Sequence, residues 1–209
     1  MNSERVLPFE KQMNDASCGA ASLSMIYKHF GVPASQKDIW DFVKAQSPIS
    51  GADYCKTHKM ALHALEAGIP CTLISVKDPL KAIKLFLPLH LEIIILYHKG
   101  NDGIAHFSPV TSATKKTISV NDPAEDSGVN IQICNINARM ASKYSMDEIV
   151  TPNIFLVFAP PKFTGEIRSA KCPNTRCNYI HPLIGLILPH VEQVICPKCD
   201  YVYSLTTDF

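Results

Sequence analysis

The residues of this chain that could do covalent chemistry begin with a cysteine at the start of a helix-forming segment. Cys18 follows Ser17 and precedes the run Gly19-Ala-Ala-Ser-Leu-Ser-Met-Ile26, and Gln12 lies six residues upstream. Unpaired N–H groups at a helix amino-terminus stabilise a thiolate and lower the pKa of a cysteine below its usual ~8.5. A glutamine amide beside such a thiolate can donate to a developing oxyanion. The segment therefore predicts a nucleophilic cysteine, although a single cysteine before an apolar helix is more commonly a buried packing residue.

A cysteine nucleophile also needs a base that takes up its proton and a third group that orients that base. His106 begins a predicted strand in Ala105-His-Phe-Ser-Pro109, and Asp122 ends the next predicted strand in Ile118-Ser-Val-Asn-Asp-Pro123. If these strands are antiparallel neighbours, the two side chains can lie next to each other. The candidate catalytic residues are therefore Gln12, Cys18, His106 and Asp122.

Four further cysteines form two pairs near the carboxy-terminus. The pairs Cys172-Pro-Asn-Thr-Arg-Cys177 and Cys196-Pro-Lys-Cys199 are separated by eighteen residues. They suit one structural Zn2+ bound by four thiolates, as in a zinc ribbon, with no coordination position open for catalysis. His181 or His190 in place of one thiol, or disulfides in an exported protein, are the alternatives. The apolar segment 181–188 between the pairs is expected to dock on the rest of the chain or on another chain.

The elements that carry these residues are predicted to be helical first and mostly extended later. Helices are expected over residues 18–30, 35–46 and 56–67, with Ser17 as the N-cap of the first, Ser35 opening the second, and Gly31 and Gly68 as stops. Strands are expected at 71–76, 91–98, 106–111, 117–120 and 154–158, with a short helix at 79–87 and a turn at 100–103. Helices followed by a mostly antiparallel sheet predict an α+β fold. A proline-containing linker at 159–165 then separates a catalytic domain at residues 1–160 from a zinc ribbon at residues 166–209.

Composition and charge restrict the class of protein. A chain of 209 residues allows one substantial core with a small appended module, and 20 Lys+Arg against 19 Asp+Glu give a net charge of +1 that predicts no nucleic-acid partner. The longest apolar stretches fall short of the ~20 residues of a membrane span. The first residues lack the pattern of a signal peptide, and the scattered cysteines favour free thiols. The expected location is the cytoplasm, and delivery into another cell without an amino-terminal signal is compatible with the same pattern.

Residues 6 to 160 resemble the papain-like cysteine peptidases, most closely peptidase family 39, whose members process bacteriocins by cutting leader peptides after a double glycine. The resemblance rests on Gln12 before the Cys18-Gly19 pair, on His106-Phe107, and on Asp122-Pro123-Ala124 sixteen residues after His106. It implies a papain-like α+β fold with amino-terminal helices packed on an antiparallel sheet, and a thiol protease acting on a peptide or protein. Position by position, it implies Cys18 as nucleophile, His106 as general base and acid, Asp122 as orienting carboxylate and Gln12 as oxyanion-hole donor.

Other residues could take two of these roles. Asn121 is an alternative to Asp122, because an amide orients the histidine in papain, and Asp126 is a second alternative. The spacing and the following proline favour Asp122. Seven further histidines are less favoured partners for Cys18, and they are His29, His58, His63, His90, His98, His181 and His190.

Two other functions fit part of the pattern. Members of family 39 are usually fused to the membrane span and nucleotide-binding domain of an export transporter, but the chain has no G-x-x-x-x-G-K-[ST] loop, so double-glycine specificity does not follow from the resemblance. Phytochelatin synthases share the fold and a histidine followed by Phe-Ser-Pro, which would imply γ-glutamylcysteine or acyl transfer. A catalytically silent fold, whose ribbon recruits a protein partner or mediates self-association, is the alternative from a different class.

Overall fold

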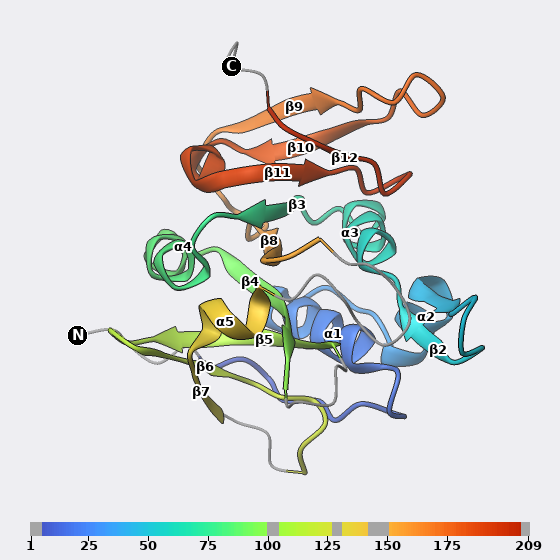
Figure 1. Cartoon of the computed structure of the whole chain (residues 1–209), viewed down its shortest axis with the longest axis vertical. Helices are drawn as coiled ribbons and strands as arrows, with labels where there is room; N and C mark the ends of the chain where they lie inside the picture. Colours follow the sequence, from blue (N-terminus) through green and yellow to red (C-terminus); the bar gives the residue numbers. More distant parts are fainter. Residues whose placement is uncertain (1–5, 100–104, 127–130, 142–150, 206–209) are drawn as a thin grey trace.

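The computed structural model describes residues 6–99, 105–126, 131–141 and 151–205 (Figure 1). The largest sheet consists of β3 (Cys71–Val76), β4 (Glu92–His98), β5 (Ala105–Ala113), β6 (Thr117–Val120), β7 (Ile131–Cys134), β8 (Ile154–Phe158), β11 (Val191–Ile195) and β12 (Val202–Tyr203). Its strands lie in the order β12-β11-β3-β8-β4-β5-β6-β7, and every neighbouring pair is antiparallel. The expected antiparallel sheet is confirmed.

The helices and the remaining strands are shorter elements around this sheet. The helices are α1 (Cys18–Phe30), α2 (Gln36–Val43), α3 (Thr57–Glu66), α4 (Pro79–Phe86) and α5 (Ile136–Met140), with 3-10 turns η1 (Leu87–Leu89) and η2 (Gly185–His190). Two small hairpins pair β1 (Lys44–Gln46) with β2 (Asp53–Cys55), and β9 (Ile167–Lys171) with β10 (Ile180–Ile184). Among the described residues, no helix has both the length and the apolar character needed to cross a membrane.

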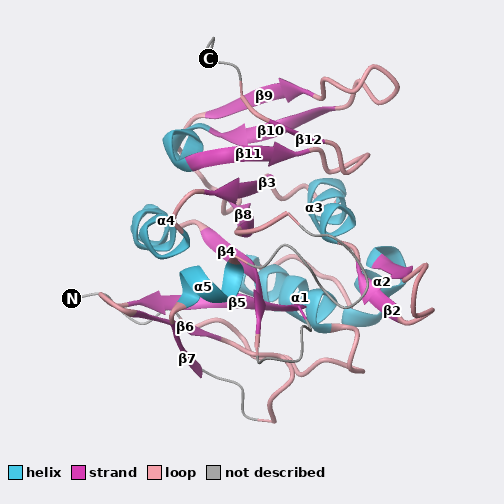
Figure 2. Cartoon of the chain, in the orientation of Figure 1, coloured by secondary structure: helices cyan, strands magenta, loops and turns pink. Residues whose placement is uncertain are grey.

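Helices cover both faces of the sheet, as Figures 1 and 2 show. On β4, Ile94 and Leu96 belong to a hydrophobic cluster that includes residues of α1, α2 and α3. Their neighbours Ile93 and Ile95 belong to a second cluster with residues of α4 and α5. A strand that is buried on both faces needs apolar residues at every position, which explains the isoleucine run that predicted an interior strand.

Most of the predicted elements are present, with differences where pairing overrides local preference. The first helix ends at Gly31, whose φ of 70° is left-handed, as the C-cap prediction requires. The second helix was expected to reach residue 46, but α2 ends at Val43, because Lys44 turns to extended geometry and residues 44–46 pair with β2. The strand β7 and the helix α5 were not predicted. The expected turn at 100–103 lies outside the described residues.

The carboxy-terminal segment contributes to the same sheet. Strand β11 pairs with β3, with Val194 opposite Ile74. Between the two cysteine pairs, Leu183, Ile184 and Ile187 are fully buried in the cluster that includes α4 and α5. The apolar segment between the pairs therefore packs on the rest of this chain.

Candidate active site

The amino-terminus of α1 places Cys18 in a closely packed position. Cys18 is buried, and a Cβ added to the adjacent Gly19 would lie 2.7 Å from Met60 Sδ and 2.8 Å from Cys55 Cβ. Only glycine allows α1 to approach α3 and β2 this closely. Cys55 Sγ also donates to the carbonyl oxygen of Ala16 at 3.4 Å. Close packing therefore explains why position 19 is a glycine, which the sequence pattern alone did not show.

Ser17 precedes the helix as predicted, but it does not cap it with its side chain. Its hydroxyl instead accepts from the backbone N–H of Asn14 and donates to the Asn14 carbonyl oxygen, both at 3.0 Å. Ser17 is therefore the N-cap residue, as predicted, but the tight turn before the helix takes up its hydroxyl.

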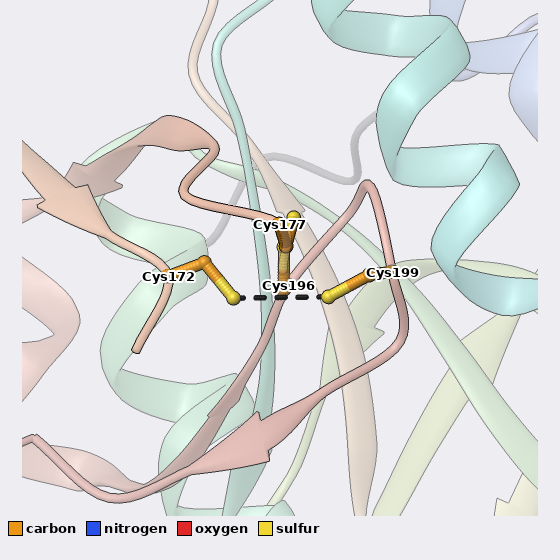
Figure 3. Close-up of side chains that lie close together, drawn as sticks. All are labelled: Cys172, Cys177, Cys196 and Cys199. Carbon is orange, nitrogen blue, oxygen red and sulfur yellow. Dashed lines mark hydrogen bonds between the residues drawn. The ribbon is translucent and has the colours of Figure 1, made fainter. Parts of the chain in front are cut away.

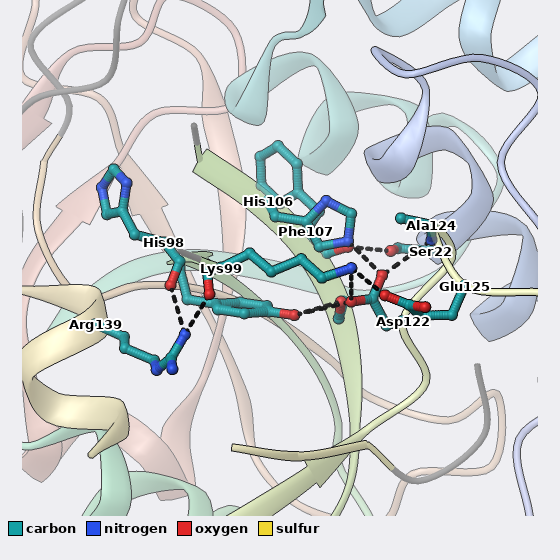
Figure 4. A network of polar contacts seen from close by, with 11 residues as sticks. Ser22, His98, Lys99, His106, Phe107, Asp122, Ala124, Glu125 and Arg139 are labelled. Atoms are coloured by element: carbon teal, nitrogen blue, oxygen red, sulfur yellow. Dashed lines mark hydrogen bonds and ion pairs between the residues drawn. The ribbon is translucent and has the colours of Figure 1, made fainter. Parts of the chain in front are cut away.

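A hydrogen bond joins α1, which carries the cysteine, to β5, which carries the histidine. Ser22, one turn after Cys18, donates its hydroxyl to the carbonyl oxygen of Phe107 at 3.1 Å (Figure 4). Phe107 follows His106 on β5, and the His106 side chain lies near enough to the Cys18 thiol for each to shift the pKa of the other. Ser22 was not identified from the sequence, since a serine inside a helix carries no local sign of a distant partner.

His106 and Asp122 form the central contact of the site. His106 Nε2 lies 2.7 Å from Asp122 Oδ1, and both side chains are buried. Asp122 Oδ1 also accepts the backbone N–H of Ala124 at 2.9 Å, and Oδ2 faces Lys99 Nζ at 3.0 Å (Figure 4). This buried carboxylate therefore has a hydrogen-bonding or charged partner on each oxygen, as a buried charge requires.

The strand end that carries Lys99 is held by further contacts. Arg139 donates to the carbonyl oxygens of His98 and Lys99, at 3.2 and 2.6 Å (Figure 4). Lys99 Nζ also pairs with Glu125. Lys99 was not predicted as a site residue, because it reaches Asp122 only through the pairing of β4 with β5 and of β5 with β6.

The electrostatics of the site favour a charged cysteine and histidine. Burial raises the pKa of the Cys18 thiol, but the hydrogen bond and positive charge of His106 outweigh it, and the pKa is lowered overall. Burial lowers the pKa of His106, but hydrogen bonds to Asp122 and Cys18 raise it to about 9. Burial likewise opposes ionisation of Asp122, yet the hydrogen bond and charge of His106 hold the pKa of that carboxyl well below its usual range.

Gln12 lies in the loop before α1 and is tied to the loop that carries Asp122. Its backbone N–H donates to the carbonyl oxygen of Pro123 at 2.9 Å. Its side-chain Oε1 is buried and, within the described residues, has no hydrogen-bond partner. The structure thus places Gln12, Cys18, His106 and Asp122 in one region, linked through the Asp122 loop and α1.

The alternative residues have other partners. Asn121 donates its side-chain amide to the carbonyl oxygen of Leu7 at 3.2 Å, and the exposed Asp126 pairs with Lys11. Among the other histidines, His63 contacts the Tyr27 hydroxyl at 2.8 Å. The carboxylate that contacts His106 is that of Asp122.

The four carboxy-terminal cysteines converge on one point (Figure 3). Cys172 and Cys199 Sγ are 3.7 Å apart, Cys177 and Cys196 Sγ are 3.9 Å apart, and all four sulfurs lie within 4.8 Å of one another. Tetrahedral coordination with Zn–S bonds of about 2.3 Å requires sulfurs about 3.8 Å apart. The cluster therefore fits a metal ion, and none of the four sulfurs forms a disulfide in this structure.

The backbone around the cluster and the nearby histidines support the same arrangement. The residues that directly follow the second cysteine of each pair, Asn178 and Asp200, both have left-handed φ, at 51° and 63°. His181 Nε2 instead contacts the Tyr203 hydroxyl at 2.8 Å, and the His190 ring lies beside Phe86. Neither histidine belongs to the thiol cluster.

Helices packed on an antiparallel sheet, with a buried cysteine at a helix amino-terminus beside a histidine, define a papain-like cysteine peptidase. The chain belongs to the Peptidase C39 family, whose sequence profile matches residues 7–144. No curated protein sequence matches the chain significantly.

Solved structures with the same fold agree with this assignment. One is a double glycine motif protease from an AMS/PCAT transporter in complex with the leader peptide, with 21% identity, a TM-score of 0.52, and coverage of 77% of this chain and 96% of that one. Another is the peptidase domain of Streptococcus ComA, a bifunctional ABC transporter in a quorum-sensing pathway, with 17% identity, a TM-score of 0.56, and coverage of 74% and 99%. A C39-like peptidase from Bacillus anthracis has 13% identity, a TM-score of 0.53, and coverage of 75% and 98%. The whole peptidase fold of these proteins is therefore represented in this chain.

Proposed function

We propose that this peptidase cleaves a peptide bond with Cys18 as nucleophile, His106 as general base and acid, Asp122 as orienting carboxylate and Gln12 as oxyanion donor. The observation that carries the proposal is the 2.7 Å contact of His106 Nε2 with buried Asp122, on a ring whose charge and that of the Cys18 thiol stabilise each other. Because Asp122 occupies Nε2, the ring's Nδ1 is the atom left for Cys18. The raised pKa of His106 and the lowered pKa of Cys18 favour a thiolate–imidazolium pair.

Each proposed step uses one of these groups. The Cys18 thiolate attacks the substrate carbonyl carbon, and the resulting oxyanion accepts from the Gln12 side-chain amide and the Cys18 backbone N–H. His106 then gives its proton to the leaving amine, which breaks the peptide bond and leaves an acyl-enzyme. His106 next takes a proton from water, which attacks the thioester and releases the carboxylate product.

The proposed substrate is a peptide or protein. The structure of the AMS/PCAT relative contains a leader peptide, which supports peptide substrates for this fold. A peptide panel that includes double-glycine sequences, together with glutathione, would separate the possible reactions by mass spectrometry of the products. Hydrolysis of peptides supports the peptidase, whereas release of glycine from glutathione alone would favour γ-glutamyl transfer.

Variants of two cysteines test the nucleophile on that panel. Cys18→Ala should abolish product formation, while Cys134→Ala, at an exposed free thiol, should retain it. Unchanged hydrolysis by folded Cys18→Ala would overturn the proposal. A protein that neither cleaves any panel member nor labels faster at Cys18 than at its other thiols would instead be a silent binding module.

We propose that Cys172, Cys177, Cys196 and Cys199 bind one structural Zn2+. The sulfur separations near 3.8 Å and the four-thiolate donor set support this ion. Four thiolates leave no open coordination position, so the ion has no step in the proposed reaction. Its binding would stabilise a short segment that has little apolar core of its own around the cysteines.

A further inference from the structure

The loop that carries Gln12 is held by the side chain of a second glutamine. Gln36, the first residue of α2, is 6% exposed. Its Nε2 donates to the carbonyl oxygen of Lys11 at 2.9 Å, and its Oε1 accepts the backbone N–H of Met13 at 2.8 Å. The two bonds use both ends of one amide and enclose Gln12 from either side.

A third bond fixes the backbone of Gln12 itself. The Gln12 N–H donates to the carbonyl oxygen of Pro123, directly after Asp122. The backbone of the short segment 11–13 is therefore tied to α2 at two points and to the Asp122 loop at one, and the exposed Lys11 side chain also pairs with Asp126. Any rotation of the Gln12 backbone would break at least one of these bonds.

Packing does not supply this constraint. Lys11 is exposed, and Met13 is 48% exposed, so the side chains on either side of Gln12 lie largely in solvent. Hydrogen bonds must therefore hold the segment in one conformation, because few apolar contacts are available to do so.

The two hydrogen bonds of the Gln36 side chain do not stabilise α2, the helix that Gln36 begins. The N-cap of α2 is Ser35, whose hydroxyl accepts the backbone N–H of Asp38 at 3.1 Å. The Gln36 side chain points instead to the loop before α1, where it satisfies a backbone donor and a backbone acceptor. Buried amides that bind backbone on both ends fix the relative position of two segments.

We propose that Gln36 is a positioning residue that holds the Gln12 side-chain amide at the oxyanion site. The inference rests on the proposed role of Gln12. An oxyanion donor is effective only when it is held within about 0.5 Å of its productive position, and loss of one such donor costs roughly 100- to 1,000-fold in kcat. A loosened Gln12 loop should therefore lower kcat even though Gln36 does not touch the substrate.

The test is a double-mutant cycle with Gln36→Met and Gln12→Ala, on a peptide that the wild-type enzyme cleaves. Gln36→Met keeps the length of the side chain and removes both hydrogen bonds. It should lower kcat about 10- to 100-fold with little change in KM, while Gln46→Ala, at an exposed glutamine, should have no effect. In a Gln12→Ala background, Gln36→Met should cost less than about twofold more, because its action passes through Gln12.

A second readout separates positioning from damage to the nucleophile. Alkylation of Cys18 by iodoacetamide forms no oxyanion, so its rate and pH profile should be the same in wild type and in Gln36→Met. Gln36→Glu, which can accept from Met13 but cannot donate to Lys11, should have an intermediate kcat. Circular dichroism shows whether each variant is folded, and Gln36→Glu serves for the cycle if Gln36→Met is not.

The possible outcomes separate the positioning role of Gln36 from the proposed oxyanion role of Gln12. If Gln12→Ala retains full kcat, the oxyanion role of Gln12 is wrong, and the positioning role falls with it. Suppose instead that Gln12→Ala lowers kcat, but Gln36→Met lowers kcat by the same factor in wild type and in the Gln12→Ala background. The oxyanion role of Gln12 is then supported and the positioning role of Gln36 is overturned. The positioning role is also overturned if Gln36→Met slows Cys18 alkylation as much as it lowers kcat.

Discussion

Replacing Asp122 with asparagine should weaken the charge pair between His106 and Cys18 while leaving the site assembled. Asparagine keeps the size of the side chain and an oxygen that can accept from His106 Nε2, but it removes the negative charge. Lys99 would lose one partner, yet it keeps Glu125 and is 42% exposed, so water can solvate it. The variant therefore isolates the effect of the buried charge.

The expected magnitude follows from the protonation of His106. The rise in the pKa of His106 from 6.5 to about 9 corresponds to about 3 kcal/mol at 1.36 kcal/mol per pKa unit. This figure sets only the scale of the effect of Asp122, because the rise is net of burial, which lowers the pKa of His106, and is shared with the Cys18 thiolate. The charge pair exists above the pKa of Cys18 and below that of His106. In Asp122→Asn the pKa of His106 should fall and the pKa of Cys18 should rise, which narrows the pH range of the charge pair. Cys18 reactivity near neutral pH should therefore drop about 10- to 100-fold.

Alkylation of Cys18 measures this change without any knowledge of the substrate. The rate of reaction with iodoacetamide is followed from acidic to alkaline pH, with the modified peptide quantified by mass spectrometry. Asp126→Asn is the matched control, because Asp126 is an exposed carboxylate four residues later that pairs with Lys11. Superimposable profiles for wild type and Asp122→Asn would refute the reasoning, since the carboxylate would then not control the ionisation of the pair.

Gly19→Ala should lower the free energy of unfolding by about 1–3 kcal/mol in urea titrations, because the new Cβ would lie 2.7 Å from Met60 Sδ; an unchanged midpoint would show that the packing is loose. Cys177→Ser should lose bound zinc by elemental analysis and unfold at lower temperature, whereas Cys134→Ser should keep both properties. The depressed pKa of Asp122 adds stability above its unfolded pKa of about 3.9 and loses it as the pH falls through the lower folded value. The stabilities of wild type and Asp122→Asn should therefore converge in strong acid, and a constant difference would contradict this assignment.

Helices and strands whose first and last residues are set by nearby residues in the sequence could be predicted. Helix α1 begins at Cys18 and ends before Gly31, and β3, β6 and β8 have the predicted bounds. Local rules suffice here, because a left-handed glycine or an apolar run has the same effect in most folds. Residues 44–46 differ, since their pairing with β2 outweighs an unexceptional helix preference.

The sequence by itself determined which groups can do chemistry, because a thiol, an imidazole, a carboxylate and four paired cysteines carry their reactivity wherever they are placed. Only the tertiary structure decided which neighbours control them. Lys99 reaches Asp122, Gln36 encloses Gln12, and β11 joins the sheet at β3, all over long distances along the chain. Such contacts depend on strand register and helix packing. These arise from burial of the whole core, and no local sequence pattern specifies them.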